Sequence, residues 1–337
     1  FSLDTIAYSA SMLSNFENNV PITSTNGLFL SYADDFNEGP DPQTSSIDST
    51  QGANGTTHCF KDIVQGGNMY VYYLPSQTMS GPLVPQAYGA DRLSIYIKMP
   101  NGYPLGADYN MAVGTYSKNP TSANNDTSTN QHFYHLFNLP GTGHWTKIIC
   151  NKHPQSTTGM TPANFGLTNN PTSWNYFSGF WKFYVDFAGK NMMSYPYTAY
   201  IDEVNFYNVT EPENDDTINS ISCSYYGNGR FLIGWHSTFY NQVELGHTYE
   251  VRYSTSPITN ANYSSATLIG SSYKYKYAYG RYYWINADFT ISVRANMRYY
   301  FAIKDISSSS TYVSKIDYLV DDAVSIQSPQ GVTVKVL

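Results

Sequence analysis

Three aspartates are the first candidates for chemistry in this chain of 337 residues. Asp34 and Asp35 follow a strand-like segment, and Asp202 lies in a segment that alternates between apolar and polar residues. Alternation places Asp202 on one strand face with Val204 and Phe206. A carboxylate on an apolar face is costly to bury unless a cation or hydrogen-bond donors meet it. The pattern therefore predicts either a Ca²⁺ site, which uses about six to eight oxygen ligands, or a carboxylate paired with backbone donors, Lys or Arg.

Aromatic side chains are the second candidates, because sugar rings stack their apolar C–H faces on Trp and Tyr. The candidate ligand-binding residues are Trp145, Trp174, Tyr176 and Tyr195. Trp174 and Tyr176 lie in a polar segment rich in Asn and Thr, whose side chains would bond to sugar hydroxyls. Binding residues are found on loops more often than on strands. Trp174 is therefore the strongest candidate, whereas a strand residue such as Trp145 is expected to be core unless the structure exposes it.

Acid–base catalysis has weaker support from the residue types and their spacing. Glycan-cleaving sandwiches need two carboxylates that face one cleft, about 5–10 Å apart. Asp202 and Glu203 are adjacent in the chain, so on a regular strand they point to opposite faces. His132 and Tyr134 are residue types that serve as base and acid, but no companion motif accompanies them. A polysaccharide-cleaving enzyme is therefore the third of the functions considered.

The composition favours a β-rich extracellular protein. Charged residues make up 13% of the chain and the aromatic set includes 33 Tyr, whereas charged residues usually make up about 25%. The net charge is −7 and no Lys/Arg cluster follows one face, so a nucleic-acid partner is not expected. No apolar run reaches the roughly 18 residues of a membrane-spanning helix.

The start of the chain and its cysteines bear on the compartment. The first residue is Phe, which we interpret as a secreted chain after removal of a signal peptide; a trimmed chain is the alternative. Cys59 and Cys150 would form the disulfide, if one forms, and otherwise all three cysteines, including Cys223, are buried thiols. Glycosylation sequons occur at Asn54, Asn125, Asn208 and Asn262.

Strand-like segments separated by Gly, Pro and Asn turns predict an all-β protein of two sandwiches. We divide the chain into an N-terminal extension (1–25), a first sandwich (26–210), a second sandwich (217–325) and a tail (326–337). The acidic, apolar-poor segment 210–218 is the predicted boundary. The predicted strands of the first sandwich are 28–32, 69–74, 92–99, 109–116, 132–139, 144–151, 177–187 and 198–209, and those of the second begin near 221 and then span 231–235, 248–253, 272–283, 289–293, 299–303 and 311–319.

The two ends of the first sandwich carry a family resemblance. The acidic Asp34-Asp35-Phe36 opening and the closing segment Ile201-Asp202-Glu203-Val204-Asn205-Phe206-Tyr207 resemble jelly-roll carbohydrate-binding modules and the related concanavalin-like sandwiches. In that family the first and last strands are neighbours, and an Asp on the last strand often binds a structural Ca²⁺ with oxygens from the early turn. The resemblance therefore implies a Ca²⁺ site at Asp202 and Asp35, with Asp34 as a further ligand.

The second sandwich resembles a fibronectin type III domain. Its Phe231–Trp235 strand carries a buried-type Trp, and Tyr249, Val251 and Tyr253 alternate with polar residues in a following strand. About seven strands in roughly 110 residues is the count of an immunoglobulin-like sandwich. Such domains usually space or present other domains.

Together these features favour a secreted, non-catalytic glycan-binding protein whose partner is a polysaccharide. The alternative is a self-associating subunit of an extracellular assembly, such as a surface layer, sheath or filament, or an adhesin. The segment 273–279, which alternates Tyr with Lys or Ala, supports that alternative if its Tyr face is exposed.

Overall fold

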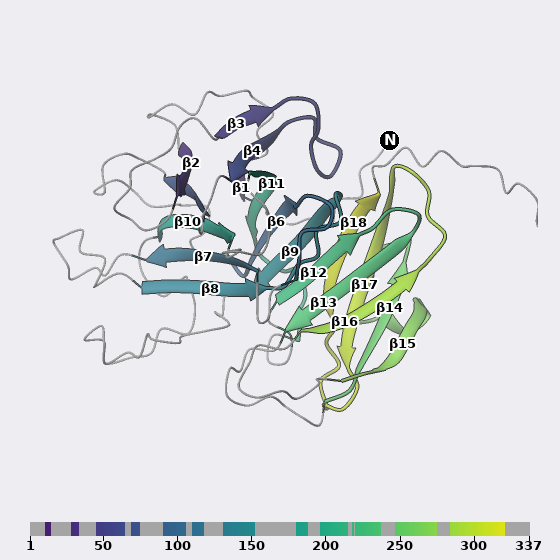
Figure 1. Ribbon diagram of the computed structural model, residues 1–337. Helices are drawn as coiled ribbons and strands as arrows, with labels where there is room; N and C mark the ends of the chain where they lie inside the picture. Colours follow the sequence, from purple (N-terminus) through teal and green to yellow (C-terminus); the bar gives the residue numbers. More distant parts are fainter. Residues whose placement is uncertain are drawn as a thin grey trace, which may run out of the picture.

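The computed structural model describes residues 11–14, 28–33, 45–64, 69–74, 90–105, 110–117, 131–151, 180–187, 196–214, 218, 220–236, 247–274 and 284–320. Within these ranges the regular structure is antiparallel β-strand, with one short 3-10 turn at Tyr263–Ser265 (Figure 1). The predicted all-β class is therefore confirmed. None of the described segments is a helix long and apolar enough to cross a membrane.

The largest sheet has nine strands in the order β16-β13-β12-β9-β6-β11-β4-β3, with β1 paired to β11. Its strands are β1 (Ser11–Ser14), β3 (Ser45–Asp48), β4 (Cys59–Val64), β6 (Arg92–Lys98), β9 (Trp145–Asn151), β11 (Tyr197–Tyr207), β12 (Ser220–Tyr225), β13 (Arg230–His236) and β16 (Ile285–Thr290).

Two smaller sheets accompany it. One has the order β2-β5-β10-β7-β8 and the other the order β15-β14-β17-β18. The first consists of β2 (Leu28–Ala33), β5 (Met69–Leu74), β10 (Phe180–Phe187), β7 (Met111–Ser117) and β8 (Gln131–Phe137), and the second of β15 (Thr267–Tyr273), β14 (Tyr249–Ser254), β17 (Met297–Asp305) and β18 (Ser314–Val320).

The nine-stranded sheet runs through both predicted sandwiches. β9 belongs to the first and β12 to the second, yet they pair directly, with Ile148 opposite Ser222. Figure 1 shows β12 and β13 continuing the sheet beyond β9. The two predicted sandwiches therefore share one sheet, an arrangement in which neither can rotate freely against the other.

The segment between the two sandwiches is held to both of them by ion pairs. Glu213 pairs with Arg92 of β6 at 3.2 Å, and Glu211 pairs with Lys315 of β18 at 2.5 Å. The Asn260 side chain also donates to the Pro212 carbonyl at 2.9 Å. Two carboxylates of the predicted boundary segment, Glu211 and Glu213, therefore have ion-pair partners in the two sandwiches, and we call these contacts the clamp.

Of the three hydrophobic clusters in the described residues, the two largest lie on opposite faces of the shared sheet. Between this sheet and the five-stranded sheet lie Leu93, Ile95 and Ile97 of β6. Tyr96 of the same strand belongs to the second cluster, between the shared sheet and the four-stranded sheet. Successive residues of β6 therefore pack on opposite faces of the shared sheet, as expected for a sheet that lies between two others.

The four-stranded sheet faces β12, β13 and β16, so the second sandwich packs three strands against four. Tyr299 near the start of β17 accepts a hydrogen bond from the Arg294 amide at 2.9 Å and donates to the Ser292 carbonyl at 3.4 Å. A tyrosine corner of this kind is typical of immunoglobulin-like sandwiches.

Several predicted elements differ from the structure. The segment 41–57, predicted as a polar loop, contains β3, because Ser45–Asp48 pairs with β4. The strand predicted over 272–283 begins earlier, since β15 spans Thr267–Tyr273 and pairs with β14. The Tyr-rich segment 273–279 lies largely outside the described residues.

The three cysteines are buried free thiols, as the second of the two sequence interpretations predicted. Cys150 lies in the cluster under the five-stranded sheet and Cys59 in the cluster under the four-stranded sheet. A disulfide between them is therefore excluded, because they face opposite sides of the shared sheet with β6 and β11 between their strands.

Candidate functional site

A β-bulge in β11 brings two carboxylates to the same side of the sheet. Asp202 lies opposite Tyr96 and Asn205 opposite Ser94, so β11 carries one more residue here than β6. Glu203 takes up the extra length with a φ of 50°, which is an uncommon backbone conformation for a residue with a Cβ atom. The prediction that Asp202 and Glu203 point to opposite faces is therefore wrong.

Both carboxylates contact the same tight turn, Ala53–Thr56. Asn54 and Gly55 have φ angles of 56° and 89°, and the Thr56 amide donates to the Ala53 carbonyl at 2.9 Å. Positive φ at both central residues is the geometry that an Asn-Gly pair favours. The turn lies beside the second sandwich. A Cβ atom in place of the Gly55 hydrogen would lie 3.5 Å from Cδ2 of Leu319 in β18, which is ordinary van der Waals contact. We call this region, formed by the turn, β6, β9, β11, β17 and β18, the junction.

Asp202 is fully buried at the junction and its oxygens accept three hydrogen bonds. The donors are the Ala53 amide at 2.7 Å, the Thr56 hydroxyl at 2.7 Å and the Glu203 amide at 2.8 Å. The Thr56 hydroxyl also lies 2.6 Å from the Ala53 carbonyl, so one hydroxyl hydrogen faces two acceptors. A proton on the Asp202 carboxyl would satisfy both, because Asp202 would then donate to Thr56 and Thr56 to Ala53.

Glu203 connects to the second sandwich through the amide of Asn54. The Asn54 Nδ2 donates to Glu203 at 3.2 Å, while its Oδ1 accepts from Arg298 Nη2 at 2.6 Å and from the Tyr96 hydroxyl at 3.4 Å. This amide is the glycosylation acceptor of a sequon, and in the folded protein it is occupied by Glu203. The Asn54 side chain is therefore a structural bridge between β11 and β17.

A third carboxylate of the junction, Asp317 of β18, binds two cations. Lys147 of β9 donates to it at 2.6 Å, and Arg298 donates to its other oxygen. The Lys147 ammonium also lies 5.4 Å from the centre of the Tyr96 ring. Although burial opposes ionisation, these two cations hold the pKa of Asp317 below its ordinary value. The junction thus contains a network of ion pairs in which Lys147 of the first sandwich meets Asp317 and Arg298 of the second.

The two bulge carboxylates behave in the opposite way. Burial raises the pKa of Asp202 to about 7, against the effect of its hydrogen bonds, and the neighbouring Glu203 charge adds to the rise. Burial also raises the pKa of Glu203, while Asn54, Lys147 and Arg298 lower it. Both effects follow from removing a charge from water. Both side chains are buried, at 0% and 7% exposure, and each bonds to the turn 53–56.

The surroundings of Asp202 fit a hydrogen-bonded carboxyl better than a Ca²⁺ ligand. Three donors direct hydrogens at its oxygens, whereas Ca²⁺ needs several further oxygens within about 2.6 Å. Across the described part of the chain, no group of three or more His, Cys, Asp or Glu side chains could hold a metal ion. Asp34 and Asp35 lie outside the described residues, so a Ca²⁺ site that includes them stays a prediction.

Among the predicted ligand-binding aromatics, Trp145 is described and buried. It is 5% exposed, its ring packs edge-on against Tyr200, and its carbonyl accepts a hydrogen bond from Tyr318 at 2.7 Å. The structure therefore places Trp145 in the core, the alternative expected for a strand residue. Trp174, Tyr176 and Tyr195 lie outside the described residues.

Of the two histidines of β8, only His135 has a described side chain. His135 is 1% exposed and its Nδ1 lies 2.9 Å from the hydroxyl of Ser220 on β12. This contact joins the five-stranded sheet to the shared sheet. The side chains of His132 and Tyr134, the predicted base and acid, lie outside the described part of the structure.

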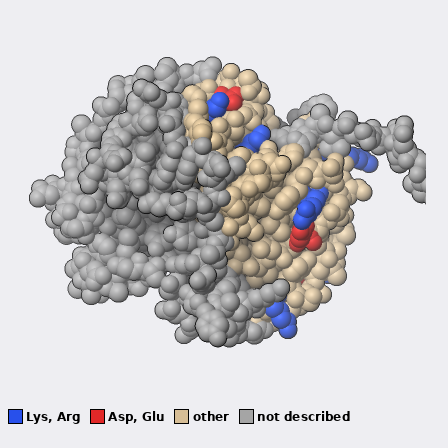
Figure 2. Space-filling model, viewed as in Figure 1, with Lys and Arg blue, Asp and Glu red and all other residues tan. Residues whose placement is uncertain are grey.

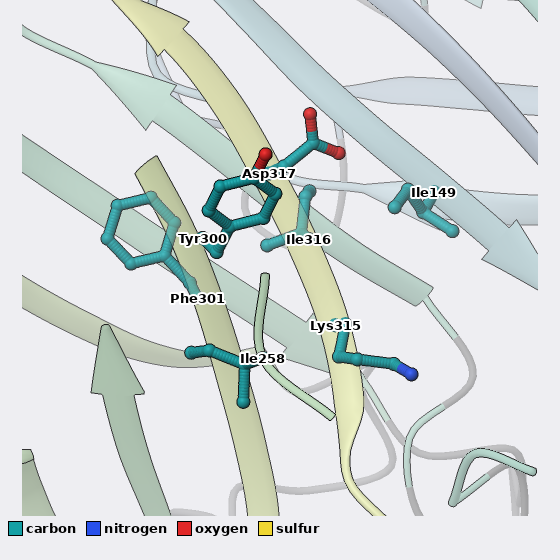
Figure 3. Close-up of a pocket in the computed structure, with 7 residues that line it drawn as sticks. All are labelled: Ile149, Ile258, Tyr300, Phe301, Lys315, Ile316 and Asp317. Atoms are coloured by element: carbon teal, nitrogen blue, oxygen red, sulfur yellow. The ribbon is translucent and has the colours of Figure 1, made fainter. Parts of the chain in front are cut away.

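One small pocket opens on the second sandwich beside the junction. Figure 3 shows its lining side chains, which come from β9, β17, β18 and the segment before the 3-10 turn. The lining residues are Ile149, Ile258, Tyr300, Phe301, Lys315, Ile316 and Asp317. The space holds roughly one group of the size of a water molecule, so it is too small to enclose a whole sugar ring.

No family model matches the chain, and no curated protein sequence matches it. Among solved structures, it is similar to the family 30 carbohydrate-binding module of the cellulosomal cellulase Cel9D-Cel44B of Clostridium thermocellum, at 10% identity over 56% of this chain and 97% of that chain, with a TM-score of 0.33.

Two further solved structures are similar at the same low level. The glycoside hydrolase domain of Endo-D from Streptococcus pneumoniae R6 is 10% identical, over 87% of this chain and 37% of that chain, with a TM-score of 0.27. The tripod from the baseplate of bacteriophage Tuc2009 is 9% identical, over 89% and 99% of the two chains, with a TM-score of 0.22. Values this low establish no shared function.

Proposed function

We propose that the protein is a secreted, non-catalytic glycan-binding protein. The observation that carries the non-catalytic part is the state of the acidic pair Asp202–Glu203: it is buried at 0% and 7% exposure and bonded to a structural turn. Glycan-cleaving enzymes need their two carboxylates open to a substrate cleft. In the described residues both carboxylates instead bond to the turn 53–56, and Asn54 of this turn connects Glu203 to Arg298 of the second sandwich.

The glycan-binding part of the proposal rests on residue chemistry. Trp174 and Tyr176 lie among Asn, Thr and Ser in the segment 169–176, which offers stacking surfaces next to hydroxyl-bonding groups. In the view of Figure 2, the described part of the surface is largely uncharged, with few Lys, Arg, Asp or Glu side chains. A surface of this kind suits a neutral polysaccharide better than a strongly charged polymer.

The second sandwich is proposed as a fibronectin type III-like platform that is rigidly joined to the first. Three strands facing four and the tyrosine corner of Tyr299 support this assignment. The shared sheet and the clamp at Glu211 and Glu213 support rigidity. A rigid pair of modules presents both of its faces to a polymer in one fixed orientation.

The proposal is tested by glycan-array binding of the wild-type protein and of Trp174→Ala and Tyr176→Ala. We expect binding to defined glycans that falls at least tenfold in both variants, because stacking area is lost. Tyr312→Ala is the matched control, since Tyr312 is 43% exposed on the second sandwich and is expected to leave binding unchanged. Binding by neither wild type nor control to any glycan would overturn the proposal.

Self-assembly is a second candidate that one specific observation favours. β15 lies at the end of its sheet and carries Leu268, which is 49% exposed. An edge strand with an exposed apolar residue is a template for pairing with another chain. If this edge supports an assembly, light scattering will show concentration-dependent polymers that Leu268→Lys abolishes. A monomer at all concentrations would remove this candidate.

A further inference from the structure

The outer face of β16 carries a row of aromatic and polar side chains. Ile285 and Ala287 of this strand are buried in the cluster between the shared sheet and the four-stranded sheet. The alternate residues Trp284, Asn286 and Asp288 therefore lie on the opposite, outer face. Asn286 and Asp288 are exposed there, and Trp284 is partly exposed. We call these three residues the outer row.

Gly234 of β13 makes room for one end of the outer row. A Cβ atom at this glycine would lie 2.8 Å from the Ser222 hydroxyl, 2.9 Å from Asn286 Oδ1 and 3.1 Å from Cε3 of Trp284. The three side chains therefore converge over the glycine. The Trp284 ring also packs against Phe137 of β8, with ring centroids 5.2 Å apart, so the indole is held where the two sandwiches meet.

The other end of the outer row is a fixed pair of opposite charges. Arg230 of β13 donates to both oxygens of Asp288, from Nε at 3.0 Å and from Nη2 at 2.6 Å. The guanidinium also lies 4.5 Å from the centre of the Tyr226 ring. The Arg230 and Asp288 side chains nevertheless stay 50% and 47% exposed. The pair therefore presents a defined set of polar groups to solvent, and its two charges cancel.

These exposed groups keep hydrogen-bonding positions for a ligand. A guanidinium has five N–H donors, and Arg230 uses two of them toward Asp288. A carboxylate has about four acceptor positions, and Asp288 uses two of them toward Arg230. Within the described part of the chain, the Asn286 side-chain amide has no hydrogen-bond partner. The face thus offers donors and acceptors side by side.

We propose that the outer face of β13 and β16 is a binding face for a neutral polysaccharide. The exposed part of Trp284 contacts the apolar C–H groups of a sugar ring, and Asn286 and the Arg230–Asp288 pair bond to sugar hydroxyls. Since a strand rises about 3.4 Å per residue, the row extends roughly 13 Å from Trp284 to Asp288 and contacts successive sugar units. This inference rests on the proposed glycan-binding function and adds a site on the second sandwich.

The chemistry of the face favours a neutral glycan over other ligands. An anion attracted by Arg230 is repelled by Asp288, and a cation meets the reverse, because the two charges lie side by side. A protein partner is matched less well, since the core of a protein interface is depleted of charged residues, whereas Arg230, Asn286 and Asp288 are exposed here. Sugar hydroxyls both donate and accept, so they pair with all three side chains.

The test uses isothermal titration calorimetry of the full chain with cellohexaose, laminarihexaose and mannohexaose, and with an oligogalacturonate of the same length. We expect at least one neutral hexamer to bind more tightly than the oligogalacturonate. Arg230→Ala should weaken this binding by about tenfold or more and Asn286→Ala by roughly two- to tenfold, the usual effects of losing a charge-assisted and a neutral hydrogen bond. Thr267→Ala is the matched control, because Thr267 is exposed on β15, in the other sheet of the same sandwich, and should leave the affinity unchanged.

The outcomes separate this inference from the proposed function. If the wild-type protein binds glycans on the array but either Arg230→Ala or Asn286→Ala binds as tightly as wild type, the outer face is not the site and the proposed function stands. Tighter binding of the oligogalacturonate, or no binding of any neutral hexamer, also overturns the inference. Losses in both variants that Thr267→Ala does not share support the site, whatever the effect of Trp174→Ala.

Discussion

The burial of Asp202 predicts a specific pH dependence of stability. The pKa of its carboxyl rises from 3.8 to about 7 in the folded protein, and one pH unit corresponds to about 1.4 kcal/mol. Keeping Asp202 ionised in the folded state therefore costs on the order of 4 kcal/mol relative to the unfolded chain. The side chain is fully buried, so solvent screening does not reduce this figure.

The sign follows from proton binding. Between about pH 4 and pH 7 the folded protein holds the Asp202 proton and the unfolded chain does not. The stabilisation is complete below the unfolded pKa and is lost as the pH rises through the folded pKa. This group alone should lower the free energy of unfolding by up to about 1.4 kcal/mol for each pH unit in that range.

The assay is urea unfolding from pH 4.5 to pH 8 for the wild-type protein and for Asp202→Asn. The variant cannot titrate at this position, so the wild-type slope should be steeper by up to about one proton. Asp288→Asn is the matched control: Arg230 holds the pKa of this exposed carboxyl below its ordinary value, so its removal leaves the slope in this range unchanged. Equal slopes for wild type and Asp202→Asn would refute the reasoning.

Three further predictions follow from the same contacts. Asn54→Ala removes the amide between Glu203 and Arg298 and should destabilise the protein by about 1–3 kcal/mol in urea unfolding. Asn228→Ala, at an exposed turn with a φ of 51°, is the control, because it measures only the cost of placing Ala in this backbone conformation. Equal losses of stability in the two variants would contradict a bridging role of Asn54. Tyr299→Phe should lower stability by about 1 kcal/mol through loss of the tyrosine corner, and an unchanged urea midpoint would argue against it. If Ca²⁺ binds with Asp202 as a ligand, calorimetry of chelated protein will show Ca²⁺ uptake that Asp202→Ala reduces; identical uptake in both removes Asp202 from any calcium site.

The sequence predicted the strands of both sandwiches well because alternating polarity is a local property. Thr248–Tyr253 reads as a half-buried strand, and the structure has β14 at Tyr249–Ser254 with Tyr249 and Val251 buried. Alternation also predicted that Asp202 shares a face with Val204 and Phe206, and this is wrong. Val204 and Phe206 lie in the cluster under the five-stranded sheet, whereas Asp202 is buried against the turn that contributes Ala53 to the opposite cluster, because the bulge intervenes.

The bulge in β11 could have been predicted in part from the spacing of apolar residues in the sequence. Apolar residues occur at Ala199, Ile201, Val204 and Phe206, so their spacing changes from two to three across Asp202 and Glu203. That irregularity is the signal of an inserted residue, and the sequence interpretation passed over it. Asn54-Gly55 is likewise a turn signature, yet nothing local indicates that the turn meets these carboxylates.

Local patterning by itself determined that this chain is built of strands, where most of them lie and which side chains are buried. The tertiary structure alone decided that β9 pairs with β12, that one sheet serves both sandwiches, and that Asn54 joins Glu203 to Arg298. The physical reason is that alternation specifies which face of a strand avoids water, whereas the choice of neighbour depends on hydrogen bonds and packing between residues far apart in the chain.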